Sequence, residues 1–365
     1  MKDIMTVKER MLAAIRMEPL DRLPFWPKLS EAYTLARKST CKGMSLSQIY
    51  DWIGSDRQEG IDSCIIEKRT KTSFEVKFSG NDRVETFSTK YGDCTRIWRF
   101  DKASQSYHPV KMPVESVEDI KRMIEYYNDC AALLDRERLE NSKRAYEAIG
   151  DKALVVTFIG ESPLMDFIEN LAGIEKGHYF LFDYTELVEE LFEAMQKCLL
   201  ERVRLIAEYN PADMFYMVEN TSTTLISPQQ FRNYCIRHIR EYEEIIDKHE
   251  RILALHMCGH LKDLLPDLAK LSARVFEAFT SPTVGNTTLL DGRKSCPDKC
   301  LFGGTNAILW TKTGEEIIEQ LKIDLGELPH HRGIIVSSAG VMPPSCEPEV
   351  IKKVSDFIKD YPVRL

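Results

Sequence analysis

Short apolar segments alternate with longer amphipathic segments along most of the chain. Near-continuous apolar segments of five or six residues are typical of parallel strands buried on both faces, and apolar positions that recur every three or four residues are typical of helices. Eight segments are expected to be strands: 22–26, 61–66, 154–159, 214–218, 252–256, 274–279, 300–304 and 333–337. The helical patterns between them predict an α/β fold, the (β/α)8 TIM barrel.

Two stretches depart from this alternation. Between 73 and 110, apolar and polar residues alternate one by one, with turn sequences at 80–82 and 91–93, which predicts a β-hairpin region inserted after the second strand. Before the first strand, Thr6 and Glu9 have the spacing of a capping box and predict an N-terminal helical extension. The clearest helical patterns lie at 184–209, 228–250 and 348–361.

Length and composition favour one globular domain that spans 1–365. Of the 365 residues 43% are hydrophobic and 29% are charged, which is ordinary for a soluble protein. The net charge of −8 argues against a general nucleic-acid binder. No apolar run reaches the roughly 18 residues of a membrane span, and the N-terminus lacks a signal-peptide core. We therefore expect a cytoplasmic protein without nucleic-acid or membrane partners, and the sequence leaves a homo-oligomer open.

The ten cysteines are scattered, mostly within predicted helices and strands. A disulfide framework is more typical of short secreted chains, so the cysteines are expected to be thiols in a reducing compartment. Cys296 and Cys300 form a Cys-x3-Cys pair without a partner pair, which argues against a separate zinc knuckle.

The strongest local signal for chemistry is His256-Met257-Cys258, at the end of a predicted strand. Side chains two apart on extended backbone point the same way, so His256 and Cys258 would both face the barrel mouth, where barrel enzymes place their catalytic groups. Imidazole and thiolate are common zinc ligands. The spacing is equally compatible with a packed cysteine and a histidine bonded to backbone.

Carboxylates follow two other predicted strands. Glu219 comes directly after 214–218 and could be a third metal ligand or a general acid or base; the alternative is a carboxylate that caps the following loop. Glu161 follows 154–159 and is a second catalytic candidate, although a carboxylate at a helix N-terminus is an equally good reading. The side of the sheet to which Glu277 points is not fixed by the pattern.

The last strands contribute three further candidates. Cys346, in the loop after 333–337, could supply another thiolate, but a plain loop cysteine is the more common case. Gly304 ends the segment 300–304 and Asn306 comes just after it, where barrels often bind phosphate, which makes them cofactor-binding candidates. A tight turn explains the glycine equally well.

Short segments spread over nearly the whole chain occur in a specific order: Glu9-Arg10, Asp21-Arg22-Leu23-Pro24, Tyr91-Gly92-Asp93, Gly160-Glu161-Ser162-Pro163, Leu171-Ala172-Gly173, 225–231, His256-Met257-Cys258-Gly259 and 337–344. In this order they resemble the uroporphyrinogen decarboxylase superfamily, and within it the corrinoid-dependent methyltransferases. The decarboxylases themselves carry an arginine-rich segment after the first strand that holds the substrate carboxylates. Here the segment 27–33 contains no arginine, which argues against decarboxylation of a porphyrinogen.

The resemblance implies a zinc site formed by the His-x-Cys pair and a distant cysteine. That cysteine usually stands in a Gly-Cys-Gly-(apolar)-Pro-Pro segment, but here Gly340 occupies its position. Either Cys346 substitutes for it, or the ligands are His256, Cys258 and a carboxylate such as Glu219, or metal binding is weakened.

The implied activity is transfer of a methyl group between a corrinoid protein and a small methylated substrate or a thiol or folate acceptor. Zinc would activate a thiol or polarise a methyl donor. The chain contains no Asp-x-His-x-x-Gly segment of the corrinoid-binding type, so the resemblance implies that the corrinoid is carried by a partner protein. Two rival interpretations are a metal-free lyase of the decarboxylase type and a non-catalytic barrel that binds a small ligand.

Overall fold

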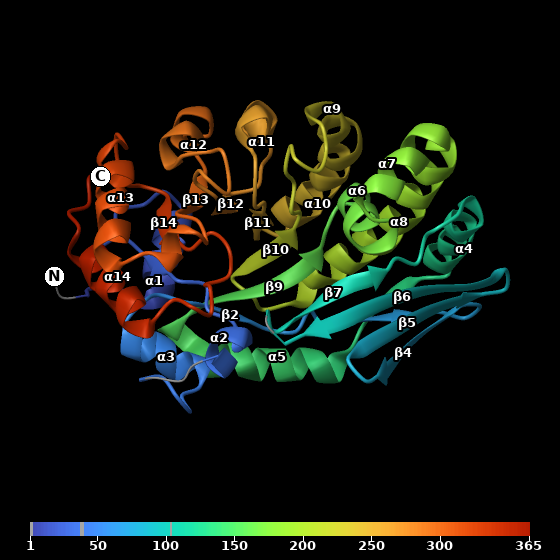
Figure 1. Ribbon diagram of the computed structural model, residues 1–365, viewed down its shortest axis with the longest axis horizontal. Helices are drawn as coiled ribbons and strands as arrows, with labels where there is room; N and C mark the ends of the chain where they lie inside the picture. Colours follow the sequence, from blue (N-terminus) through green and yellow to red (C-terminus); the bar gives the residue numbers. More distant parts are fainter. Residues whose placement is uncertain (1–2, 37–39, 103) are drawn as a thin grey trace.

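The computed structural model describes residues 3–36, 40–102 and 104–365. Its centre is an eight-stranded parallel sheet in the order β1-β14-β13-β12-β11-β10-β9-β2, which forms a nearly closed barrel (Figure 1). These strands are β1 (Phe25–Trp26), β2 (Gln58–Gly60), β9 (Leu154–Gly160), β10 (Met214–Val218), β11 (Ile252–His256), β12 (Val275–Phe279), β13 (Cys300–Gly304) and β14 (Ile334–Ser337). The predicted barrel class is confirmed.

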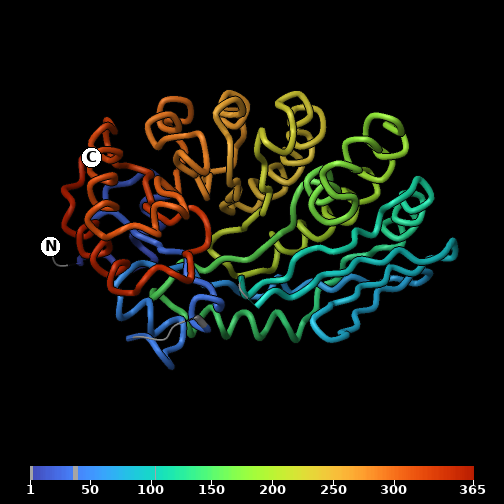
Figure 2. The backbone as a smooth tube through the Cα atoms, in the orientation of Figure 1, coloured from blue at the N-terminus to red at the C-terminus, as the bar shows by residue number. Residues whose placement is uncertain are grey.

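The helices lie outside this sheet, with α10, α11 and α12 in sequence order along one side (Figures 1 and 2). Their bounds are α1 (Val7–Ile15), α2 (Glu31–Ala36), α3 (Leu46–Ile53), α4 (Val117–Asn128), α5 (Arg136–Ile149), α6 (Pro163–Asp166), α7 (Ile174–Asp183), α8 (Thr185–Tyr209), α9 (Pro228–Gln230), α10 (Ile236–Lys248), α11 (Leu265–Leu268), α12 (Leu289–Ser295), α13 (Gly314–Gly326) and α14 (Pro348–Asp360). The predicted capping box of α1 is present, because Thr6 accepts from the Glu9 N–H and Glu9 accepts from the Thr6 N–H.

The second barrel strand lies elsewhere than predicted. The segment 61–66 was expected to be this strand, but β2 ends at Gly60 and the apolar run is divided by a turn. The Cys64 N–H donates to the Asp62 carboxylate at 2.6 Å, and Cys64 has a φ of +66°. An Asx turn of this kind reverses the chain. The residues beyond it form β3 (Ile65–Lys68), which pairs antiparallel with β8 (Ala131–Leu134) outside the barrel.

The inserted hairpin region forms a four-stranded antiparallel sheet: β4 (Ser73–Ser79), β5 (Asp82–Thr89), β6 (Gly92–Asp101) and β7 (Ser106–Lys111). This sheet extends away from the barrel, and α4 covers one of its faces (Figure 1). Phe87 of β5 packs edge-on against Tyr126 of α4, with ring centroids 5.1 Å apart. The sheet is therefore anchored by an apolar contact rather than free-standing.

The expectation that the cysteines are thiols is wrong for one pair. Cys130, just before β8, and Cys198 of α8 form a disulfide across a sequence separation of 68 residues. Scattered positions in the sequence gave no indication of this pair. Among the described residues, no helix has the length and apolar character needed to cross a membrane.

The register of three neighbouring strands places specific residues at the mouth of the barrel. Val218 of β10 lies opposite His256 of β11, and His256 lies opposite Glu277 of β12. Both β11 and β12 are almost entirely buried, as expected for strands covered on both faces. Their carboxyl ends therefore bring an imidazole and a carboxylate together without any loop.

Candidate functional site at the barrel mouth

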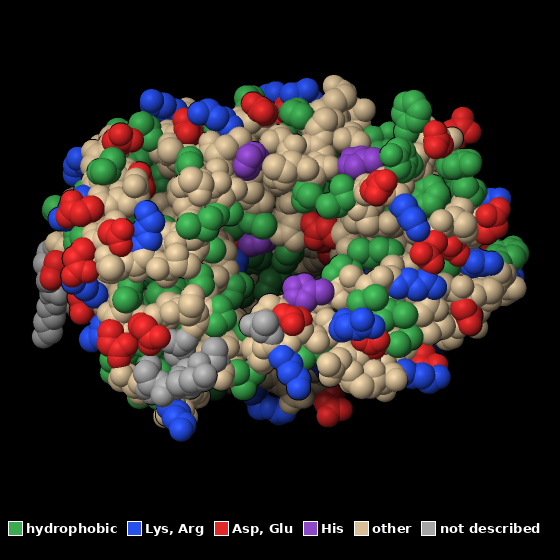
Figure 3. Space-filling model, in the orientation of Figure 1, with side chains coloured by type: hydrophobic (Ala, Val, Ile, Leu, Met, Phe, Trp, Pro, Cys, Tyr) green, Lys and Arg blue, Asp and Glu red, His purple; other side chains and the backbone are tan. Residues whose placement is uncertain are grey.

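A cavity of about 280 Å³ opens among the strand ends and includes Trp26, Lys28, Tyr216 and His256 in its lining. The face drawn in Figure 3 is hollowed near its centre, with hydrophobic side chains in the hollow. Active sites of barrel enzymes lie at this end of the strands. His256 therefore lies, as predicted, at the end of the barrel where enzymes of this fold have their active sites.

His256, Glu277 and Lys28 form a charged cluster at this mouth. Nδ1 of His256 is hydrogen-bonded to Oε2 of Glu277, which is completely buried. Lys28 Nζ donates to Oε1 of Glu277 at 2.9 Å and lies 3.3 Å from His256 Nδ1. Burial alone would lower the pKa of His256, but the Glu277 carboxylate overrides it and raises that pKa; Lys28 and His256 in turn hold the pKa of Glu277 low against its burial.

Cys258 is exposed in the loop after β11. Its Sγ lies 3.6 Å from Oδ1 of Asn220, and it is close enough to His256 to raise the pKa of that imidazole. Since Glu277 engages Nδ1, Nε2 is the ring nitrogen that remains for a metal or a substrate. A carboxylate behind a ligating histidine is the usual partner in zinc sites, so the donors His256 and Cys258 fit zinc.

Glu219 follows β10 as predicted, but its carboxylate is buried rather than exposed to the mouth cavity. Its two oxygens accept from the hydroxyl and the N–H of Ser162, at 2.7 and 2.8 Å. Burial raises the pKa of Glu219 to about 7, and the Ser162 hydrogen bonds oppose that shift. The structure thus links Glu219 to the turn after β9.

Glu161 belongs to a cluster of acidic groups that includes Asp166 and Glu169. Asn170 bridges two of them, because its Nδ2 donates to Asp166 at 2.9 Å and to Glu161 at 3.4 Å. Burial, reinforced by the neighbouring carboxylates, raises the pKa of Glu161 to about 9. Glu161 therefore holds a proton at neutral pH, as a general acid must.

Sequence reasoning missed Asp166 and Glu169. They are three residues apart in the helical turns that follow Pro163, and this i, i+3 spacing is the signal that could have found them. Glu169 accepts from Asn220 Nδ2 at 2.9 Å, and the other side of that amide faces Cys258. Asn220 therefore connects the acidic cluster to the His256–Cys258 pair.

The other residues predicted from the sequence lie apart from the His256–Cys258 pair. Cys346 is buried, with its Sγ 3.9 Å from the carbonyl oxygen of Glu347. Gly304 and Asn306 line a separate cavity of about 400 Å³. The Asn306 amide donates to the Pro282 carbonyl at 2.8 Å and accepts from the Leu309 N–H at 3.0 Å, so it holds two loops together.

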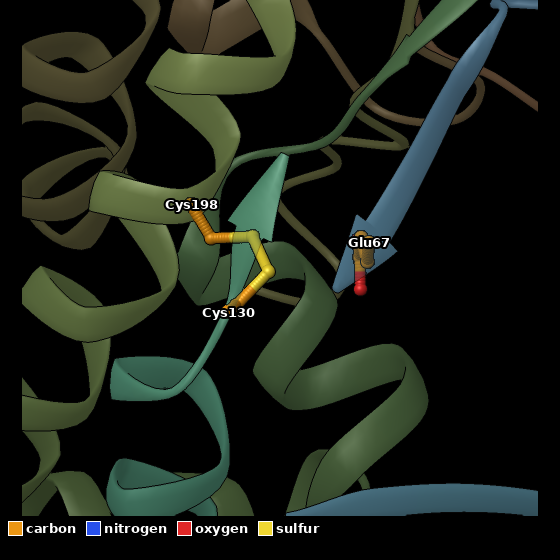
Figure 4. A group of neighbouring side chains, drawn as sticks. All are labelled: Glu67, Cys130 and Cys198. Carbon is orange, nitrogen blue, oxygen red and sulfur yellow. A yellow bond between two sulfur atoms is a disulfide. The ribbon is translucent and has the colours of Figure 1, made fainter. Parts of the chain in front are cut away.

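Among the residues that the structure describes, His256 and Cys258 belong to no group of three His, Cys, Asp or Glu donors within 4.8 Å of one another. One such group exists elsewhere, formed by Glu67, Cys130 and Cys198 (Figure 4). Its two sulfurs are bonded to each other, and thiolates are what zinc binds, so the oxidised group does not offer a zinc site.

The chain belongs to the uroporphyrinogen decarboxylase (URO-D) family, whose family model matches residues 108–361. A methyltransferase from Methanosarcina mazei has a similar structure, with a TM-score of 0.60 and 14% sequence identity over 97% of this chain and 98% of that one. A protein described as a vitamin-B12-independent methionine synthase from Listeria monocytogenes gives a TM-score of 0.39 and 11% identity, over 93% and 96% of the two chains. No curated protein sequence matches the chain significantly. The family model confirms the family that the sequence indicated, and the Methanosarcina mazei structure confirms the fold.

Proposed function

We propose that this protein is a zinc-dependent methyltransferase that exchanges a methyl group with a corrinoid carried by a partner protein. The observation that carries the proposal is His256, held through Nδ1 by a buried carboxylate, with Cys258 two residues further on at the barrel mouth. Family membership and the fold shared with the Methanosarcina mazei methyltransferase support it.

Each residue of the charged cluster has a distinct part in this proposal. Glu277 fixes the tautomer and the ring orientation of His256, so that Nε2 is presented to the cavity. Lys28 keeps Glu277 ionised and compensates its charge. Zinc held by His256 and Cys258 would supply Lewis acidity, either to a thiol acceptor or to a methylated donor.

The other predicted ligands are less accessible in this conformation. Glu219 would have to give up two hydrogen bonds from Ser162, and Cys346 would have to leave its buried position. We therefore propose two ligands from the protein, His256 and Cys258, with substrate and water completing the coordination. Glu161 is proposed as the acid that protonates the leaving group.

The first test is metal content. The whole chain, purified without a metal-affinity tag, is compared with Cys258→Ala and His256→Ala, and with Cys94→Ala as a matched control at a buried cysteine of β6. We expect about one zinc per chain in the wild type and the control, and none in the two mouth variants. Methyl transfer is then followed by the absorbance change of the corrinoid.

Wild-type protein that holds no zinc after zinc is added would contradict the proposal and favour a metal-free lyase or a ligand-binding barrel. Zinc retained by both mouth variants would show that the metal is bound elsewhere. Either result leaves the family and the fold unaffected.

A further inference from the structure

A second cavity lies beside the barrel, where α8 and the end of β9 meet β3 and the antiparallel sheet. Its volume is about 630 Å³, within the range of small-molecule sites. Three arginines, Arg69, Arg96 and Arg202, contribute to its lining, together with aromatic side chains that include Phe87 and Tyr126. It is not the mouth cavity, because His256, Lys28 and Tyr216 line the other one.

Arg202 is the unusual member of this group. Within the described part of the chain its guanidinium has no hydrogen-bond or ion-pair partner, and its Nε is fully buried. Burial lowers the pKa of Arg202. Arg202 as a whole is half-buried, but a buried guanidinium N–H without a partner is costly, and natural structures keep such groups where a ligand or water compensates them.

The other two arginines are already compensated in charge. Arg69 donates to the Glu67 carboxylate at 2.8 Å, and its guanidinium carbon lies 3.9 Å from the centre of the Tyr126 ring. Its side chain is only 9% exposed, yet its Nε has no partner. Arg96 is paired with the buried Glu85. The Arg202 guanidinium, which Glu67 and Asp62 attract without forming an ion pair, and one spare donor, Nε of Arg69, therefore remain for a ligand.

The acidic groups on the rim do not cancel this charge. Burial raises the pKa of both Glu161 and Asp166, which favours the protonated, uncharged form of each carboxyl group. Figure 4 shows a third carboxyl group of the lining, that of Glu67 on β3, beside the disulfide that joins Cys198 of α8 to Cys130. That carboxylate is the one paired with Arg69.

We propose that this cavity binds a small monocarboxylate with an apolar or aromatic body. The carboxylate is held by Arg202 and by Nε of Arg69, and the body packs against Phe87 and Tyr126. Guanidinium groups match the planar geometry of a carboxylate, and one arginine without an ion pair suits a monoanion better than a phosphate dianion. The aromatic rings, 5.1 Å apart at their centroids, give the apolar part of the ligand its contact surface.

Glu161, the proposed acid of methyl transfer, also lines this cavity, but the proposal concerns binding alone, so its test is a binding measurement. Isothermal titration calorimetry of the whole chain compares benzoate with benzamide, a neutral molecule of the same shape, and with inorganic phosphate. We expect saturable binding of one benzoate per chain, with benzamide and phosphate each at least tenfold weaker.

Two arginine variants locate the site. Arg202→Gln removes the unpartnered charge and is expected to weaken benzoate binding at least tenfold; it should fold normally because no protein partner is lost, which thermal unfolding verifies. Arg144→Gln, at an exposed position on α5, is the matched control and should bind like the wild type. The proposal is overturned if benzoate gives no saturable heat, if benzamide or phosphate binds as tightly, or if Arg202→Gln binds benzoate unchanged.

Discussion

Glu277→Gln is the substitution that best separates the proposed metal site from a merely structural cluster. The carboxylate accepts from His256 Nδ1 and from Lys28, and it is completely buried. A glutamine of the same shape keeps one acceptor oxygen and replaces the other by an amide that donates. Its one oxygen can accept from either the imidazole or the lysine, and the amide that faces the imidazole would donate to Nδ1, which puts the ring proton on Nε2 instead.

Two effects follow, and both weaken zinc binding. Loss of the carboxylate behind a ligating histidine costs about 10- to 100-fold in metal affinity, or roughly 1.4–2.7 kcal/mol. In addition, Lys28 keeps its charge 3.3 Å from His256 Nδ1 without a counter-charge, which disfavours a cation nearby. We expect the dissociation constant for zinc to rise about a hundredfold.

The assay is competition for zinc with a chromophoric chelator at fixed pH. Glu243→Gln is the matched control, since Glu243 is also a buried glutamate but accepts from the Ala273 N–H, away from the mouth. Adding Lys28→Met to Glu277→Gln should recover about tenfold of the lost affinity, because the uncompensated charge is removed. A Glu277→Gln protein that binds zinc within twofold of the wild type would refute the proposed orienting role.

Four further outcomes are expected. Arg10→Met breaks two buried ion pairs, which leaves Asp21 without an arginine and Asp56 with Arg22 alone, and it should lower the free energy of unfolding by about 3–5 kcal/mol, measured with urea. Glu161 has a folded pKa near 9 against about 4.5 when unfolded, so the protein should lose stability as pH rises between these values; Glu161→Gln should remove that loss in thermal unfolding across the same range. Gly304→Ala places a Cβ 2.7 Å from Leu289 at a φ of +87° and should cost about 1–3 kcal/mol in urea unfolding. Cys130→Ser opens a loop of 68 residues and should cost about 4 kcal/mol, with mass spectrometry of alkylated protein as the check on the disulfide.

The barrel could be predicted from the sequence because its strands are fixed by local pattern. Three of them, β10, β11 and β13, have the bounds that the apolar runs indicate. The second strand could not be placed, because the apolar run 61–66 contains a turn that depends on one side-chain hydrogen bond, from Cys64 to Asp62. Apolar character alone does not distinguish a straight strand from one that is broken in this way.

Residues of the candidate site could be predicted only where they stand at the carboxyl end of a barrel strand. His256 was found because it ends a strand, and strand ends meet at one rim. Glu277 could not be assigned to a side, since all five residues of β12 are buried and Ala278 has a φ of +62°, which breaks the alternation of side chains. Lys28 matters because it pairs with Glu277 on a distant strand, and Arg202 because its Nε has no partner. Neither property can be inferred from the spacing of residues in the sequence.

The barrel mouth and the cavity beside β9 differ in how burial is compensated, and the difference bears on the reaction. On the side of β11 and β12, Lys28, His256 and Glu277 balance one another, so the imidazole keeps a fixed orientation. Beside β9, burial and the neighbouring carboxyl groups of Asp166 and Glu169 raise the pKa of Glu161, so Glu161 keeps its proton. A reaction that binds its substrate at an oriented electrophilic site and then protonates a leaving group needs this asymmetry. A cluster that served stability alone would do better with the acids paired, as Arg10 is with Asp21 and Asp56, since burying unpaired carboxyls lowers the stability of the fold.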